Sequence, residues 1–168
     1  MHTAYVVSVW LHIVAAAFWV GGMLFLVLVV VPWVRHADRR IAVGMLRDTG
    51  RRFRNLAWVS FAVLLATGRF NLWVRGVRPA DLGRADWLSS PFGHAVVIKL
   101  AVFAVVIALS ALHDFVLGPR ATQAAERDPR AADTERLRRA ASYVGRANLL
   151  LGLLLFFVGV TLVRGCVW

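Results

Sequence analysis

The chain has 168 residues, 60% of them hydrophobic, and its mean hydropathy is +0.67. An ordinary soluble domain is about 45–50% apolar, so this composition excludes a disordered tail and argues against a soluble enzyme. Lysine and arginine outnumber the acidic residues by 20 to 9, and Lys99 is the single lysine. The one cysteine, Cys166, excludes an intrachain disulfide and a metal cluster built from several cysteines of one chain.

Four hydrophobic segments predict an all-α integral membrane protein, a four-helix transmembrane bundle that forms a single domain over residues 1–168. A helix needs about 20 apolar residues to cross a bilayer. The stretch from Ala4 to Val34 contains no Asp, Glu, Lys or Arg and lacks the basic start and short apolar core of a signal peptide. The expected helices cover residues 4–34, 56–74, 91–117 and 143–163, with Pro91 opening the third helix and Gly118-Pro119 ending it.

Arginine is distributed unevenly, and this predicts the orientation of the chain. The loops 35–55 and 118–142, with the residues directly after them, carry 14 of the 19 arginines. The positive-inside rule places such loops in the cytoplasm, so both termini are expected outside, and aromatic residues flank the spans as interfacial belts do. The excess positive charge is thus explained by the retention of basic loops on the cytoplasmic side of a bacterial-type inner (plasma) membrane, and the lipid bilayer is the expected partner. We expect no nucleic-acid partner.

Several ionisable side chains fall inside the spans, where each is costly and points to function. His12 and Lys99 both lie eight residues into helices that enter from outside, about 12 Å deep at the helical rise, so both segments carry an ionisable residue about two turns in. Arg69 is closer to the same surface, and the pair His113-Asp114 belongs to the cytoplasmic end.

Helical spacing predicts which faces of the spans point into the bundle. One face of the first helix carries Ser8, His12, Ala16, Trp19 and Met23, and one face of the third carries Lys99, Phe103, Val106, Ser110 and His113. The second helix presents Ser60, Thr67 and Asn71, with Arg69 on a different face that allows it to reach the headgroups. The fourth offers small residues for close contact at Gly145, Gly152 and Gly159.

Each polar residue admits a structural and a functional interpretation. Lys99 either snorkels to the interface or supplies an amine, whose pKa can shift on burial as that of arginine cannot. His12 is either a hydrogen-bonded structural residue or a ligand for copper or iron. His113 either marks the end of a helix or is an imidazole oriented by Asp114. His94 and His2 are expected at the outer surface, where His94 is a further candidate metal ligand.

Three stretches resemble the copper resistance protein D (CopD) family. The run from Leu11 to Arg35 resembles the family's first helix, with a histidine (His12) followed by a Trp-x-Gly-Gly step (Trp19, Gly21 and Gly22). Residues 52–71 are similar to its next helix, which ends in a Thr-Gly pair, here Thr67-Gly68. Residues 98–120 are similar to the following helix, whose early lysine matches Lys99. A looser similarity links the chain to HemJ, a bacterial haem-containing protoporphyrinogen oxidase with a similar His-plus-Lys pattern.

These resemblances imply an inner-membrane protein linked to copper handling, or alternatively a b-type haem redox protein. The expected centre lies in the outer half of the bilayer. The cofactor-binding candidates are His12, Lys99 and Arg69, the metal-ligating candidates are His12, His94 and His113, and no catalytic residue is assigned. Lys99 or Arg69 would pair with haem propionates. A third alternative is a non-catalytic membrane subunit that packs against a membrane partner or a second copy of the chain.

Overall fold

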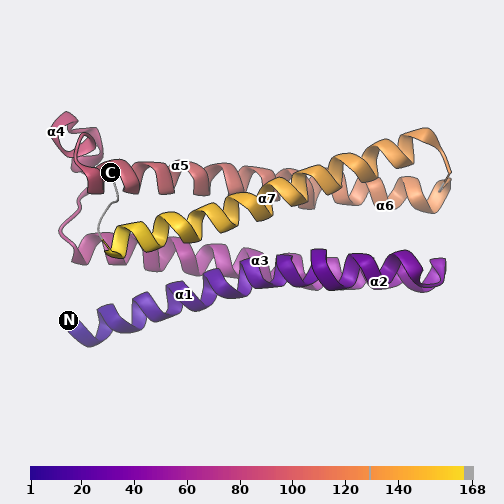
Figure 1. Cartoon of the computed structure of the whole chain (residues 1–168), viewed down its shortest axis with the longest axis horizontal. Coiled ribbons are helices and arrows are strands. Elements are labelled where there is room, and N and C mark those ends of the chain that lie inside the picture. The colour runs from indigo at the N-terminus through magenta and orange to yellow at the C-terminus, as the bar shows by residue number, and fades with distance from the viewer. Residues whose placement is uncertain (129, 165–168) are drawn as a thin grey trace. The chain divides into compact units, whose positions relative to one another are not determined.

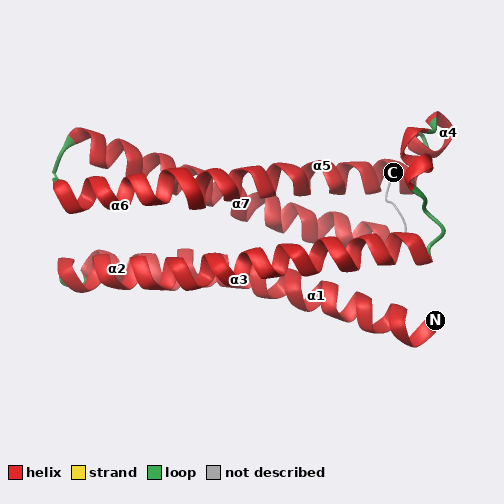
Figure 2. Ribbon diagram, turned by 180° about the vertical axis from the view of Figure 1, so that it is seen from behind, coloured by secondary structure: helices red, strands yellow, loops and turns green. Residues whose placement is uncertain are grey.

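The computed structural model describes residues 1–128 and 130–164, so Cys166 and the terminal Trp168 of the expected aromatic belt lie outside the described residues. Helices make up nearly all of the described chain (Figure 2). Within it, four helical stretches are long and apolar enough to cross a membrane: His2–Val34, Gly44–Val74, Pro91–Arg127 and Ala132–Leu162. The all-helical, four-span architecture predicted from the sequence is therefore confirmed. The chain divides into two compact units, Met1–Ser90 and Pro91–Trp168.

The first unit is a helical hairpin. The helix α1 (His2–Phe25) continues through a π-helical turn, η1 (Leu26–Val30), into α2 (Val31–His36), and α3 (Arg39–Val74) returns alongside α1 (Figure 1). Trp19 and Phe61 pack edge to face at the centre of this hairpin, with ring centroids 5.0 Å apart. Trp58 also packs edge to face against Phe61, with ring centroids 5.5 Å apart. Ser8, Trp19 and Met23 are buried, which confirms these positions of the predicted inward face of the first helix.

A short connection completes the first unit, with a 3₁₀ turn, η2 (Pro79–Gly83), and one helical turn, α4 (Ala85–Leu88). Arg84 holds Asp86 here through a hydrogen bond of 2.6 Å from Nη2 to Oδ2. This hydrogen bond lowers the pKa of the exposed Asp86 carboxyl below its ordinary value.

The second unit is also a helical hairpin. It contains α5 (Pro91–Leu112), the π-helical turn η3 (His113–Leu117), α6 (Gly118–Arg127) and α7 (Ala132–Arg164), and α7 packs along α5 (Figure 1). Val106 and Ser110 are buried, as the predicted face of the third helix requires. Asn148 of α7 donates a buried hydrogen bond of 2.7 Å to the hydroxyl of Ser110. This bond ties the two helices at a level where lipid offers no alternative partner.

The helices are longer than the sequence predicted. The expected loops 35–55 and 118–142 are mostly helical, because α3 already begins at Arg39, α6 covers Gly118–Arg127, and α7 begins at Ala132. Arginine is a good helix former, and Glu135 and Arg139 add an i,i+4 ion pair of 2.8 Å. The basic segments therefore extend the spanning helices beyond the apolar segments.

The prediction that Gly118-Pro119 ends the third helix is wrong. Pro119 lacks the N–H that an α-helical ladder needs, but the turn before it widens to a π-helix in which the Gly118 N–H bonds to the His113 carbonyl. Pro32 is accommodated in the same way, since the Val31 N–H bonds to the Leu26 carbonyl. Both helices thus pass a proline because one turn widens.

The two units repeat one plan in sequence register. An offset of 87 residues relates η1 to η3, Pro32 to Pro119, and His12 to Lys99. An offset of 91 residues relates four buried positions and one glycine of α3 to those of α7: Ala57, Phe61, Leu64, Thr67 and Gly68 correspond to Asn148, Gly152, Leu155, Val158 and Gly159. The two units thus share the spacing of these features, and His12 and Lys99 fall at matching positions in sequence.

Candidate functional site

His12 is held by a threonine on the neighbouring helix of the first unit. Its Nδ1 lies 2.8 Å from Oγ1 of Thr67. The Thr67 hydroxyl donates its one hydrogen to the Val63 carbonyl at 2.6 Å. With the hydroxyl hydrogen on that carbonyl, the threonine oxygen accepts from the ring, and we assign the neutral imidazole to the Nδ1–H tautomer on this basis. The lone pair of His12 consequently lies on Nε2, the atom that would bind a metal or take a proton.

Close contact between α1 and α3 keeps this ring in place. A Cβ at Gly68, the residue after Thr67, would lie 3.4 Å from Cε1 of His12. This distance is ordinary van der Waals contact, so the glycine backbone lies close beside the half-buried imidazole.

Lys99 has a corresponding environment in the second unit. Its Nζ lies 3.6 Å from the position that a Cβ would take at Gly159 of α7. The lysine is half-buried. It lies beside Gly159, one of the small residues that were predicted to allow close contact between helices. A glycine thus accommodates the ionisable side chain in both units.

The other predicted site residues are placed separately. Arg69 and His94 are exposed, Arg69 on α3 and His94 near the start of α5. His113 lies in the π-helical turn η3, where its Nδ1 is 3.0 Å from Oδ1 of Asp114. A Cβ at Gly145 would lie 3.9 Å from Nε2 of His113, so a second glycine of α7 faces a polar side chain of the α5–α6 stretch.

Within the first unit the structure groups His12 with Thr67 and Gly68, and within the second it groups Lys99 with Gly159 and His113 with Asp114. Over residues 1–128 and 130–164, no three or more His, Cys, Asp or Glu side chains gather as a metal ion would require. Among the candidate metal ligands, His12 is therefore the one whose ring is bonded to a side chain of a second helix, Thr67 of α3.

Sequence reasoning included Thr67 in a polar stripe but gave it no role, and it passed over Gly68 and Gly159 as partners of the ionisable residues. The stripes were the available signal, because a polar residue on each of two facing helices invites a bond across them. Periodicity gives the face of one helix. It does not give the axial offset between two helices, which decides that His12 meets Thr67 rather than Ser60 or Asn71.

Comparison with known proteins supplies the family. The family model described as copper resistance protein D, CopD, matches residues 47–162. The chain belongs to the CopD family. Together with the four apolar helices, this membership identifies a multi-pass membrane protein of a copper-related family.

Two relatives extend this finding. An uncharacterized protein of Aquifex aeolicus (strain VF5) is 33% identical over 156 residues, which cover 92% of each chain. The copper transport protein CutJ of Bacillus subtilis (strain 168) is 30% identical over 103 residues. These residues are 61% of this chain and 17% of CutJ, so the CopD-like chain aligns with only a part of that longer protein. No solved structure matches the chain.

Proposed function

We propose that this CopD-family protein binds copper within the membrane, in the outer half of the bilayer, and that Nε2 of His12 is a ligand. The observation that carries the proposal is the chain of hydrogen bonds from His12 through Thr67 to the Val63 carbonyl. Metal-ligating histidines usually donate their other ring N–H to a partner that fixes the tautomer and the orientation. Thr67 is such a partner. The name of the relative CutJ, a copper transport protein, supports copper as the metal.

Lys99 belongs to the proposed centre on the ground of depth. His12 and Lys99 each lie eight residues into a span that the positive-inside rule has entering from outside, so we propose that the two residues lie at a similar depth. A lysine amine at that level either coordinates when neutral or balances the charge of an anionic ligand. Arg69, His94 and His113 receive no role in this proposal.

A b-type haem is the second candidate for the same histidine. An axial haem ligand needs one imidazole with its Nδ1–H tied to a neighbour and its Nε2 directed at the iron, and the bond to Thr67 supplies that arrangement at His12.

The membrane is proposed to be the bacterial inner membrane, with the arginine-rich ends of the hairpins on the cytoplasmic side.

The decisive experiment compares His12→Ala with His2→Ala in protein purified in detergent. The wild type is expected to bind Cu(I) in proportion to protein, as measured by competition with a chromogenic chelator, and His12→Ala is expected to lose this binding. His2 is exposed at the start of α1, so His2→Ala serves as the matched control and keeps it. An absorption spectrum of the same samples decides the second candidate, since a Soret band that disappears in His12→Ala would assign haem instead.

Equal copper content in the two variants would overturn the assignment of His12. A colourless protein that binds no copper would overturn both candidates and leave the interpretation as a non-catalytic membrane subunit.

A further inference from the structure

Hydrogen bonds between α1 and α3 define how the two antiparallel helices of the first unit are aligned. His12 lies beside Thr67, and nearer the N-terminal end Nε of Arg75 donates a hydrogen bond of 3.1 Å to the hydroxyl of Tyr5. Tyr5 precedes His12 by seven residues and Thr67 precedes Arg75 by eight, so the helices keep one alignment over this length. Residues between these two pairs can therefore be matched across the interface.

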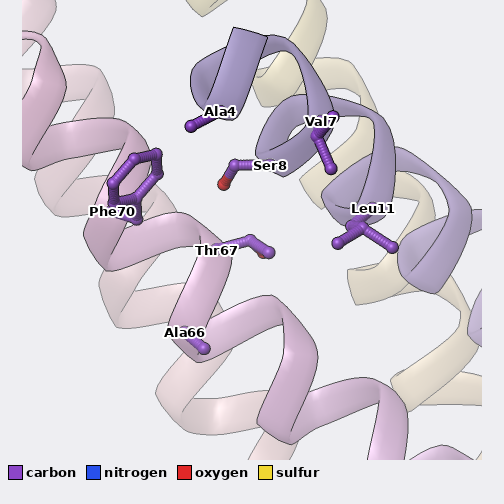
Figure 3. Close-up of a pocket in the computed structure, with 7 residues that line it drawn as sticks. All are labelled: Ala4, Val7, Ser8, Leu11, Ala66, Thr67 and Phe70. Atoms are coloured by element: carbon purple, nitrogen blue, oxygen red, sulfur yellow. The ribbon is translucent and has the colours of Figure 1, made fainter. Parts of the chain in front are cut away.

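Ser8 and Asn71 lie between the two pairs. Ser8 is four residues before His12, and Asn71 is four residues after Thr67, so the alignment places them at one level on facing helices. Figure 3 shows Ser8 extending from α1 toward α3, on the helix face opposite Thr67. The interface thus carries a polar pair at each turn from its N-terminal end to His12.

The middle pair holds two buried atoms whose hydrogen-bonding capacity is unused. Oγ of Ser8 and Oδ1 of Asn71 are both buried, and neither has a hydrogen-bond partner within residues 1–128 and 130–164. The hydroxyl is a donor and the amide oxygen an acceptor, so one water molecule between them would satisfy both. Water is the usual partner of buried polar atoms that a protein leaves unpaired. We therefore expect this level of the hairpin to be hydrated.

On the other side of His12 the interface is apolar and closely packed. Ala15 and Trp19 of α1 and Phe61 and Leu64 of α3 are buried there, with at most 8% of each residue exposed. Trp19 and Phe61 are in edge-to-face contact. An ion that crossed such a layer would lose its ligands in an apolar environment, which is costly. The aromatic layer therefore closes the interface toward the arginine-rich end of the hairpin.

Ser60, the neighbour of Phe61, does not change this. Its hydroxyl donates to the Leu56 carbonyl of its own helix at 3.0 Å, the ordinary arrangement of a serine inside a helix. Ser8 has a carbonyl at the same spacing, that of Ala4, yet among the described residues it makes no such bond. The hydrogen of Ser60 is thus committed to its own helix, whereas that of Ser8 is available to water.

We propose that copper reaches and leaves His12 along the hydrated polar pairs between His12 and the N-terminal end of α1, and that the layer of Trp19 and Phe61 blocks exchange with the other side of the membrane. The inference rests on the proposed function, because it describes how copper bound at His12 exchanges. The first unit then holds copper that is accessible from one side, and its α1–α3 interface is no path across the membrane.

The test measures from which side the impermeant Cu(I) chelator bathocuproine disulfonate removes copper from the full chain. Cells are loaded with copper during growth and converted to right-side-out and to inside-out vesicles. Impermeant labelling of Thr3→Cys in a parallel sample reports which vesicles expose the start of α1. Removal is expected from those vesicles, and from the opposite preparation only after detergent is added. Copper retained by His12→Ala is subtracted as background.

Two substitutions test the polar pair itself. Ser8→Ala removes the donor and Asn71→Leu the acceptor with little change in size, and each is expected to slow removal about three- to tenfold, the effect of one net hydrogen bond on a barrier. Copper content at equilibrium is expected to stay unchanged, because neither residue is a proposed ligand. Ser60→Ala is the matched control, since it also removes a buried hydroxyl, and it is expected to exchange copper as the wild type does.

Equal removal from both vesicle preparations, or removal only from those that hide the start of α1, would overturn the inference and leave copper binding at His12 intact. Equal rates in Ser8→Ala, Asn71→Leu and Ser60→Ala would overturn it as well. A wild-type copper content no higher than that of His12→Ala would instead overturn the proposed function, and this inference with it.

Discussion

At the scale of single residues, the hydroxyl of Thr67 determines the chemistry available at His12. It has one hydrogen, which the short distance to the Val63 carbonyl places on that carbonyl. In this arrangement the ring donates through Nδ1, and the lone pair is left at Nε2. A threonine on a neighbouring helix thus has the orienting role that a carboxylate has in many metal sites.

Replacement of this threonine is expected to weaken copper binding while the fold is kept. Thr67→Val preserves the shape of the side chain but removes the acceptor of the Nδ1–H hydrogen. Loss of such an orienting partner typically lowers metal affinity about 10- to 100-fold, which Cu(I) competition would measure. Thr161→Val is the matched control, because Thr161 is buried and bonds only to its own helix, at the Val158 carbonyl. An equal loss in both variants would contradict the role of Thr67.

Lys99 gives a second residue-scale prediction, which distinguishes an amine from a guanidinium of the same charge. Its Nζ already lies within 3.6 Å of where a Cβ at Gly159 would be. Arginine is longer, planar and always charged, so Lys99→Arg is expected to reduce copper binding although the positive charge is kept. The control is the reverse type of exchange at an exposed site, Arg120→Lys on α6. Unchanged copper affinity in Lys99→Arg would show that charge alone suffices.

At the scale of elements, glycine determines how closely α1 approaches α3. A methyl group added at Gly22 would overlap the ring of Phe53, while one added at the adjacent Gly21 would meet nothing within 4 Å. In the membrane, helices associate through such close packing and not through a difference in hydrophobicity. Alanine substitutions at these two neighbouring glycines therefore distinguish the effect of packing on stability from that of helix propensity.

Gly22→Ala is expected to destabilise the first unit and Gly21→Ala is not. Overpacking of this kind costs about 1–3 kcal/mol, while both substitutions share the same gain in helix propensity of about 1 kcal/mol. Thermal unfolding in detergent is expected to show a lower Tm for Gly22→Ala than for Gly21→Ala. Equal melting temperatures would show that Phe53 moves aside freely.

The elements also show where sequence reasoning reaches its limit. Apolar length located the spans, and periodicity located the buried faces that carry Trp19 and Val106. Pro119 was misinterpreted because a proline after glycine usually ends a helix, whereas a π-helical turn compensates for its missing N–H here. The basic segments were expected as loops because polarity suggested exposure, but an exposed segment can still be helical when α3 or α7 continues through it.

At the scale of the whole molecule, the two hairpins match in the sequence positions of a π-helical turn, a proline and a glycine. The two units differ in chemistry at one matching position, where the first carries the imidazole of His12 and the second the amine of Lys99. Sequence spacing alone predicts a common depth for these two residues. The partners of each side chain depended on packing within the hairpins and were not predictable.

The orientation of the two hairpins is the last prediction. With an even number of spans both termini lie on one side, and the arginine-rich ends of α3, α6 and α7 are expected in the cytoplasm, where positive residues are retained. Labelling of single cysteines with a membrane-impermeant maleimide in intact cells tests this on a Cys166→Ser background. Thr3→Cys at the start of α1 and Gly83→Cys in the connection are expected to be labelled.

Gln123→Cys, exposed on α6, is expected to react only after the cells are permeabilised, which also serves as the control that this cysteine is reactive. The reverse pattern would place the arginine-rich ends outside and contradict the positive-inside interpretation. It would also move His12 to the cytoplasmic half of the membrane, because His12 lies near the end of α1 that carries the N-terminus. The labelling result therefore decides from which side of the membrane copper would reach His12.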